Sequence, residues 1–425
     1  MRRRRSNLFA GLDWPLVLCY CLFVGMGWVN IYAASSGSES WTLFNLSTDY
    51  GKQLIWIALS IPLAIVILLF DAKFYERFSS VFYLISIALL IGLFLFGKTV
   101  NGATSWYSLG NASLQPAEFA KSMTALAIAK LLTDKQFNLQ RLRSQLEVLA
   151  ILAIPALLIT LQPDPGSALI YTSFIMVLYR EGLPSYYVLL GMAIVVLFLT
   201  TLFVGYFNML LGIAAICTLT LLYLVIYQRK VLKKQWIKIV GICLISAIYV
   251  VSADLIFHQV FEQRHRDRIN IVLGKNKDTE SIGYNTHQSV KTIASGGLSG
   301  KGFLQGERTQ GDFVPEQQTD YIFSTVGEEW GFLGTSLVVI MFTVFLCRII
   351  WLSERQKNRF SRAYGYGIAG IFFFHFFINI GMVVGLLPTV GIPLPFFSYG
   401  GSALWGFTVL LFILLRLDAD RSYTW

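Results

Sequence analysis

Apolar runs of about 20 residues follow one another along most of the chain, separated by short polar connections. A run of that length crosses a bilayer as one α-helix, because each residue adds about 1.5 Å and the hydrocarbon core is about 30 Å thick. The pattern predicts an all-α polytopic membrane protein with about twelve transmembrane helices. The runs lie at about 14–34, 53–70, 79–97, 116–133, 147–162, 167–180, 186–203, 208–227, 236–257, 321–347, 363–386 and 400–416.

Four arginines precede the first run. A basic start followed by an apolar run can be a signal peptide, here with Ala33 and Ala34 near the cleavage point. This run is longer than a usual signal peptide requires and many runs follow it, so a retained first helix is the better interpretation. The arginines then place the N-terminus in the cytoplasm.

Lys and Arg residues are distributed unevenly between the connections. If the helices alternate from a cytoplasmic start, the short external turns near Pro163, Gly205 and Pro388 carry no Lys or Arg. This asymmetry satisfies the positive-inside rule and places both termini in the cytoplasm. The predicted internal connections hold Lys73, Arg77, Lys135, Arg141, Arg143, Arg180, Arg229, Lys230, Lys233, Lys234, Arg355, Lys357, Arg359, Arg362, Arg416 and Arg421.

The stretch 186–227 can be two short spans or one long span plus a surface segment. Two spans are favoured, because one would place the basic stretches 229–238 and 348–362 outside. We therefore expect one membrane domain over residues 1–425, with an external loop at about 258–318. That loop contains eight Lys or Arg residues. They suggest an anionic partner, and a solvated loop is equally compatible with them.

Composition adds few candidate sites. The chain is 55% hydrophobic and 14% charged, with a formal net charge of +10. None of the five cysteines has CxxC spacing, and the four histidines form no HExxH pair. We therefore expect no disulfide and no zinc site.

A cluster of carboxylates lies where the external loop meets the next apolar run. Glu316, Asp320, Glu328 and Glu329 fall within fourteen residues of one another. Carboxylates at a membrane edge are energetically costly, so a functional site is expected there. Asp320 could instead cap the following helix. Glu328 and Glu329 lie roughly 12 Å further along that helix, too far to act with Asp320, and receive no role.

Two other external segments contain candidate residues. Residues 97–121 form a predicted turn-rich loop, in which Trp106 and Tyr107 can be interfacial anchors or a platform for a sugar or headgroup. Glu118 and Lys121, spaced i, i+3 on the following helix, can form a pair that is either structural or part of a polar cavity. The glycine-rich residues 283–306 can bind phosphate or simply be flexible.

Together these stretches resemble the SEDS family (shape, elongation, division and sporulation), in its RodA/FtsW branch and closer to RodA. The matching stretches are GATSWYSLGNASLQPAEFAK, QPDPGSA, GYNTHQSVKTIASGGLSGKGFLQG, VPEQQTDYIFSTVGEEWGFLG and PLPFFSYGGSA. They occur in the family's order and span most of the chain. Each is weak alone, and together they are specific.

The resemblance implies a peptidoglycan glycosyltransferase of cell elongation and shape in the bacterial cytoplasmic membrane. It would polymerise lipid II on the outer face, with a class B penicillin-binding protein as partner and no nucleic acid. Asp320 matches the family's essential aspartate. The residues expected to bind substrate are Trp106, Glu118, Lys121, Arg266, Arg268, Gln288, Ser289, Lys301 and Glu316.

Three features depart from the family pattern. Gln318 stands where a histidine is usual, so no His–Asp dyad is expected there. Pro165 replaces the usual leucine in the QPDPGSA motif. The predicted span count exceeds the usual ten by two, with the excess expected within 186–257.

The chemistry of lipid II suits these residues. An α-linked sugar diphosphate becomes a β-1,4 linkage in one inverting displacement, which needs a general base and no enzyme nucleophile. Asp320 is the candidate base. The leaving diphosphate needs positive charge from Lys or Arg or from a divalent cation, Mg²⁺ or Mn²⁺, although no metal ligands are assigned.

Several other functions fit many of the same features. A lipid II flippase or related transporter would also need many spans, but its key polar residues should lie near the membrane midplane. Here they gather at the external edge, which favours the enzyme. A scaffold without chemistry of its own, or a division protein of the FtsW type, would also be compatible with the pattern.

Overall fold

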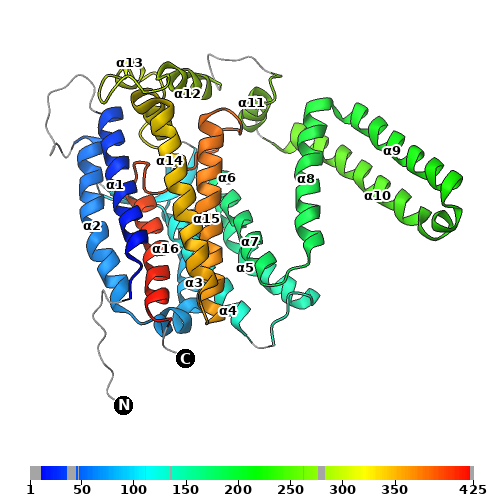
Figure 1. The fold of residues 1–425 in the computed structure, drawn as a ribbon, viewed down its shortest axis with the longest axis horizontal. Helices are drawn as coiled ribbons and strands as arrows, with labels where there is room; N and C mark the ends of the chain where they lie inside the picture. The colour runs from blue at the N-terminus through cyan, green and yellow to red at the C-terminus, as the bar shows by residue number, and fades with distance from the viewer. Residues whose placement is uncertain are drawn as a thin grey trace. The chain divides into compact units, whose positions relative to one another are not determined.

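The computed structural model describes residues 11–35, 45, 47–100, 102–110, 112–134, 136–261, 263–275 and 283–421. Helices dominate, joined by one small sheet (Figure 1). The elements are α1 Trp14–Ser35, α2 Asp49–Leu69, α3 Ala72–Phe96, β1 Lys98–Val100, β2 Ala103–Leu109, β3 Ala112–Leu114, α4 Pro116–Thr133, α5 Leu142–Leu161, α6 Pro165–Leu169, the 3₁₀ helix η1 Ile170–Phe174, α7 Ile175–Arg180, α8 Ser185–Val204, α9 Tyr206–Tyr227, α10 Arg229–Leu255, the π-helical turn η2 Ile256–Val260, α11 Gln263–Val272, α12 Tyr284–Ser295, α13 Glu307–Gln310, α14 Ile322–Glu354, α15 Arg359–Val383 and α16 Gly401–Ala419. The four N-terminal arginines and Lys135, used above for orientation, lie outside the described residues.

Within the described residues, ten helices are long and apolar enough to cross a membrane. The all-α membrane fold is therefore confirmed. The other two predicted spans correspond to α4 and to the bent segment α6–η1–α7. The first is largely buried and carries polar side chains, and the second is divided into three short pieces. The count of twelve thus depends on how these two segments are classified.

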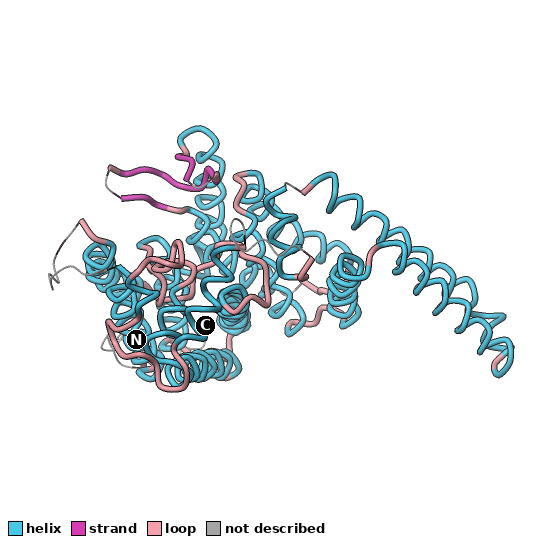
Figure 2. Tube along the Cα trace, turned by 90° about the horizontal axis from the view of Figure 1, so that it is seen from above, coloured by secondary structure: helices cyan, strands magenta, loops and turns pink. Residues whose placement is uncertain are grey.

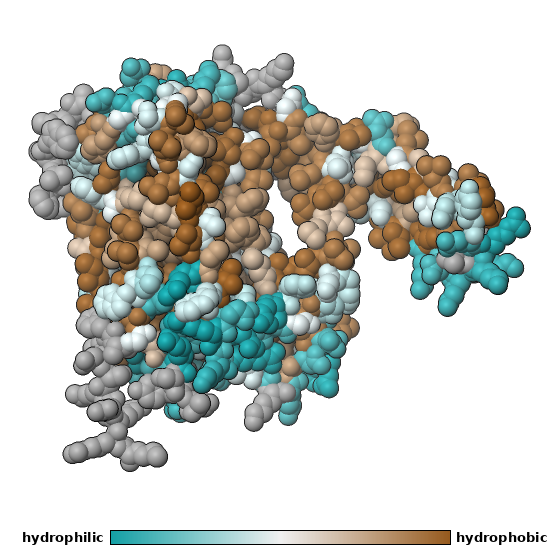
Figure 3. All heavy atoms as spheres, in the orientation of Figure 1, coloured by the Kyte–Doolittle hydropathy of each residue, from teal (hydrophilic) through white to brown (hydrophobic). Residues whose placement is uncertain are grey.

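The chain forms two compact units, one of residues 1–184 and 285–425 and the other of residues 185–284. In the larger unit, α15 and α16 are the most buried spans. Helix α16 packs against α2 and α4, and α15 packs against α14 and α4 (Figure 1). In this unit, hydrophilic residues gather at two ends with a hydrophobic band between them (Figure 3), as a membrane-spanning body requires.

The smaller unit contains the three helices expected between Pro184 and His258. Each of the three helices α8, α9 and α10 is unbroken, and α9 packs against α10. Gly205, whose φ is +90°, connects α8 to α9. Residues 186–227 thus form two helices, each long and apolar enough to cross a membrane.

One end of the larger unit, which we call the basic end, brings together several of the predicted internal connections. Arg416 contacts Asp71 at 3.0 Å, which joins α16 to the α2–α3 turn. Glu181 accepts bonds from Arg359 at 2.8 Å and Arg362 at 3.1 Å. The alternating topology requires these connections to share one end, and they do.

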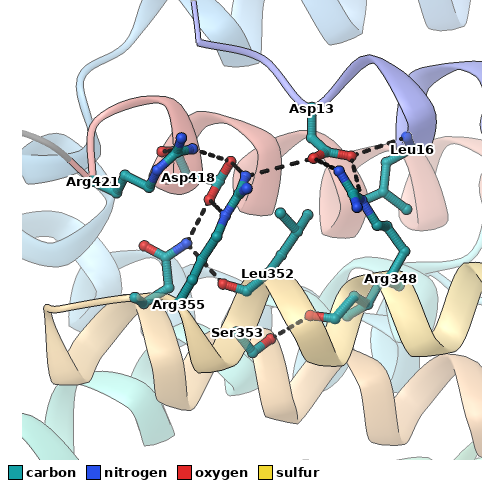
Figure 4. Close-up of polar contacts among 10 residues, drawn as sticks. Asp13, Leu16, Arg348, Leu352, Ser353, Arg355, Asp418 and Arg421 are labelled. Carbon is teal, nitrogen blue, oxygen red and sulfur yellow. Dashed lines mark hydrogen bonds and ion pairs between the residues drawn. The ribbon is translucent and has the colours of Figure 1, made fainter.

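Charged side chains also join the first and last helices at the basic end (Figure 4). Asp13 accepts a bond from the Leu16 amide at the start of α1 and is held by Arg348 of α14 at 2.7 Å. Arg355, at the end of α14, bonds Asp418 of α16 through Nε at 2.9 Å and lies 3.5 Å from Asp13. Both carboxylates are buried, where an unpaired charge would be costly, and the arginines compensate their charges.

Helix α14 is broken at Gly331, where φ is +63° and ψ is −158°. The backbone groups freed by the break bond to the loop of residues 297–302. The amides of Phe332 and Leu333 donate to the carbonyls of residues 297 and 298 at 2.9 and 3.1 Å. In return, the amides of residues 301 and 302 donate to the carbonyls of Glu328 and Glu329, both at 3.0 Å. The predicted span 321–347 exists, but as two helical pieces.

Gly331→Ala is expected to destabilise the larger unit by about 1–3 kcal/mol from backbone strain alone. A Cβ there would lie 2.3 Å from the backbone nitrogen of Gly300, so the loop would also have to move. Thermal unfolding of the purified protein measures the effect. Gly191→Ala in α8 is the control, since nothing lies within 4 Å of its Cβ position. An equal loss of stability in both variants would contradict the prediction.

The expectation of a turn-rich loop at 97–121 was incomplete, because part of it forms an antiparallel sheet of order β1-β2-β3 (Figure 2). Val100 pairs with Ala103, and the sequence between them is Asn-Gly. This dipeptide favours the tight turn of a hairpin. Tyr107 fixes the sheet to the membrane helices by donating to the Leu89 carbonyl at 2.8 Å.

Candidate active site

Asp320 lies in the turn before α14, at the end opposite the basic end. Tyr321 is the N-cap of α14, so Asp320 is one position too early to cap that helix. Its side chain is half-buried. The Asp320 carbonyl accepts a bond from Asn379 of α15 at 2.8 Å. A Cβ placed on Gly391 would lie 3.4 Å from the Asp320 Oδ2 atom, so the carboxylate faces this glycine.

An irregular segment, residues 389–393, lies between Asp320 and α15. Asn379 donates to the Ile392 carbonyl at 2.7 Å, and His375 Nδ1 lies 3.2 Å from the Pro393 carbonyl. The QPDPGSA motif packs on the same segment, because a Cβ at Gly166 would lie only 2.3 Å from the Val390 carbonyl. The segment that precedes the PLPFFSYGGSA motif therefore lies between Asp320, which faces Gly391, and the QPDPGSA motif, which packs on Val390.

The predicted Glu118–Lys121 pair exists and is fully buried. Lys121 Nζ lies 2.9 Å from both carboxylate oxygens of Glu118 and 2.9 Å from His375 Nε2. Because a carbonyl can only accept, His375 carries its proton on Nδ1, and Nε2 accepts from the ammonium. All three ammonium hydrogens then have partners, and the neutral imidazole leaves one positive and one negative charge in balance.

Glu328, which received no role from the sequence, anchors the loop that covers the break in α14. Its carboxylate accepts bonds from Lys301 Nζ at 3.0 Å, the Arg308 amide at 3.1 Å and the Thr309 amide at 2.7 Å. Glu329 Oε1 accepts from the Leu304 amide at 3.1 Å. Lys301 therefore supports this loop, and its side chain is 27% exposed.

Gln288 and Ser289 make structural contacts. Ser289 is buried and donates to the Val383 carbonyl at 2.8 Å, which fixes α12 to the end of α15. Gln288 accepts a bond from Arg308. A role of these two side chains in binding substrate stays a prediction.

Gln318 and Glu316 flank the turn that holds Asp320. Gln318 stands at the position where the family has histidine, and its side-chain amide donates to Asp49 of α2 at 3.3 Å. The backbone carbonyl of Gln318 accepts from the Tyr399 amide at 2.9 Å. Burial and then the nearby Asp49 raise the pKa of Tyr399 to about 12, so this phenol is protonated at neutral pH. Glu316 has φ +55° and accepts from Thr319 through its carbonyl at 3.1 Å.

The remaining candidates lie in other parts of the fold. Trp106 is half-buried in β2 opposite Lys98 of β1. Arg266 and Arg268 belong to α11 of the smaller unit, where Arg266 donates to the His258 carbonyl at 2.8 Å. Pro165 occupies the first turn of α6, where proline needs no amide hydrogen, and Asp164 caps that helix by accepting from Ser167 at 3.0 Å.

His375, Asn379 and Asp49 are site residues that the sequence reasoning missed. The signal was the pair of polar residues spaced i, i+4 in the apolar stretch HFFIN, since polar side chains inside a span usually have a function. Among the residues that the structure describes, no group of three or more His, Cys, Asp or Glu side chains could hold a metal ion.

Comparison with known proteins identifies the family. The family model described as cell cycle protein, FtsW/RodA/SpoVE, matches residues 13–210 and 191–423. Peptidoglycan glycosyltransferase RodA of Treponema pallidum is 30% identical, over 96% of this chain and 98% of the relative. Peptidoglycan glycosyltransferase MrdB of Escherichia coli strain K12 is 30% identical, over 83% of this chain and 81% of the relative.

A solved structure agrees with these relatives. A chain from the work described as "Structural coordination of polymerization and crosslinking by a peptidoglycan synthase complex" is 25% identical, with a TM-score of 0.71. The match covers 97% of this chain and 99% of that one. The resemblance found in the sequence motifs is thereby confirmed, and the chain belongs to the FtsW/RodA/SpoVE (SEDS) family.

Proposed function

We propose that this multi-pass membrane protein polymerises lipid II with Asp320 as general base. The chain is a peptidoglycan glycosyltransferase of the RodA type, as its relatives are named. The observation that carries the residue assignment is the position of Asp320, which is half-buried at one end of the membrane body, bonded by Asn379 and facing Gly391. The end that carries Asp320 faces the outside of the cytoplasmic membrane, and the basic end faces the cytoplasm.

The reaction is a single displacement at the anomeric carbon of the donor sugar. The 4-hydroxyl oxygen of the acceptor forms the new β-1,4 bond while the bond between that carbon and the diphosphate breaks. Asp320 takes the proton of the hydroxyl, and the polyprenyl diphosphate leaves with the bonding electron pair. No enzyme nucleophile and no oxidant or reductant is needed.

Lys121 supports this reaction indirectly and does not bind the phosphate in this structure. Its three ammonium hydrogens are already bonded to Glu118 and His375. In the larger unit, the partly exposed Lys301 is the candidate to meet the leaving diphosphate. The same role for Arg266 and Arg268, and stacking of Trp106 on a sugar, belong to this proposal as predictions.

A class B penicillin-binding protein, which cross-links the glycan strands, is the proposed partner. The likeness to a chain from a peptidoglycan synthase complex that couples polymerisation and crosslinking supports this assignment. This transpeptidase would act on the outer side of the membrane, where the new strand emerges.

Purified protein, with and without its transpeptidase, should convert lipid II in detergent to glycan strands that are resolved by gel electrophoresis. In detergent no membrane has to be crossed, so polymer formation separates an enzyme from a transporter. Absence of polymer under both conditions, together with movement of lipid II across vesicle membranes, would support the transporter instead. Absence of both activities would leave the scaffold.

A further inference from the structure

Asn379 contacts the backbone of Asp320 from the C-terminal end of α15. Its amide nitrogen lies 2.8 Å from the Asp320 carbonyl and 2.7 Å from the Ile392 carbonyl. The side chain is completely buried. Both neighbours are acceptors, so both amide hydrogens are used and the orientation of the amide group is fixed.

That orientation leaves the other half of the amide without a partner. Asn379 Oδ1 is buried and has no hydrogen-bond partner among the described residues. A buried acceptor is rarely left unpaired, and such groups in native structures call for an explanation. Here, the amide orientation that lets Asn379 donate to both Asp320 and Ile392 leaves Oδ1 without a partner.

A second side chain of α15 contacts the same segment. His375, one turn before Asn379, contacts the carbonyl of Pro393, the residue after Ile392. These two contacts hold consecutive residues of the irregular segment against α15. Gly391, the residue before Ile392, then lies against the Asp320 carboxylate, with a Cβ position 3.4 Å from Oδ2.

We propose that Asn379 is a positioning residue for the general base, which fixes Asp320 relative to the 391–393 segment and to the buried Lys121 cluster. This inference rests on the proposed function of Asp320. Asn379 itself does not exchange a proton with substrate. Its effect is to place the carboxylate, and misplacement of a catalytic group by about 1 Å can cost on the order of 10² in rate.

The test measures kcat and KM for lipid II polymerisation by the full chain with its transpeptidase. Asn379→Ala is expected to lower kcat about 10- to 100-fold while KM changes less than about twofold. Tyr364→Phe is the matched control, because it also removes a buried bond from α15 to a backbone carbonyl, that of Leu410 at 3.1 Å, at the basic end. It should keep the wild-type kcat.

Asn379→Leu provides a second variant in case the alanine leaves a damaging cavity, since leucine keeps the branching and removes both donors. A kcat within about twofold of Tyr364→Phe in either folded variant would overturn the proposal, as would a raised KM at unchanged kcat. Failure of both variants to fold would make Asn379 a stability residue and also overturn it. Polymerisation by Asp320→Asn would refute the base assignment itself, whereas an inactive Asp320→Asn beside normal Asn379 variants would refute only this inference.

Discussion

Asp320→Asn should abolish glycan polymerisation, with a fall in kcat of about 10²–10⁴. Asparagine has nearly the same shape as aspartate but cannot accept the proton of the acceptor hydroxyl. The bond from Asn379 goes to the Asp320 carbonyl, which the substitution leaves in place, so the fold should be kept. Strand formation from lipid II in detergent, followed over time, measures the loss.

The control for this result is Asp312→Asn. Asp312 is an exposed carboxylate eight positions earlier in the same loop, with φ +49°, a conformation that asparagine also accepts. It should polymerise at the wild-type rate. Equal activity of Asp312→Asn and Asp320→Asn would remove the general-base assignment.

Lys121→Met should lower the free energy of unfolding by about 3–5 kcal/mol, because it leaves the Glu118 carboxylate buried without a counter-charge. The double variant Glu118→Gln/Lys121→Met should recover most of that loss, since neither charge remains. Chemical or thermal unfolding in detergent measures all three proteins. The polymerisation rate of the folded double variant then shows whether the pair is only structural or also serves the reaction.

Lys130→Met is the comparison for this cycle. Lys130 lies on the same helix and contacts Glu76 at 3.3 Å, but its side chain is 44% exposed. Removing such a surface pair should cost less than about 1 kcal/mol. If Lys121→Met lowered the free energy of unfolding as little as Lys130→Met, the buried pair would contribute no more to stability than the surface pair.

The spans could be predicted from the sequence because their signal is local. An apolar run long enough to cross the membrane core is stable there as an α-helix. Helices α1, α2 and α16 accordingly lie close to the predicted ranges. The i, i+3 pairing of Glu118 with Lys121 was predictable for the same reason. Helix geometry alone brings those two side chains together.

The break in α14 could not be predicted in the same way. Gly331 lies in an apolar run, where glycine is tolerated within a span and gives no unique signal. The break is stable because residues 297–302 satisfy the freed backbone groups, and that loop is about 30 positions earlier in the chain. The sheet at 98–114 was missed because two of its strands, β1 and β3, have only three residues each, too few for a clear alternating pattern.

The contacts that build the site depend on tertiary structure. His375 is 254 positions from Lys121, and Asn379 is 59 positions from Asp320. Sequence motifs indicated the regions of Lys121 and Asp320, but no spacing rule connects either of them to α15. The role proposed for Asp320 could therefore be predicted from its motif, whereas its contact with Asn379 could not.

The charged cluster at the basic end has a consequence for the order of events during synthesis. Asp13 is among the first residues made, and its partner Arg348 follows 335 positions later. Asp418, which shares Arg355 with it, comes almost last. The bond between Asp13 and Arg348 can form once α14 has been made, whereas the bond between Arg355 and Asp418 can form only after α16 has been made. Chains that stop before α16 would therefore leave Arg355 without its closest carboxylate.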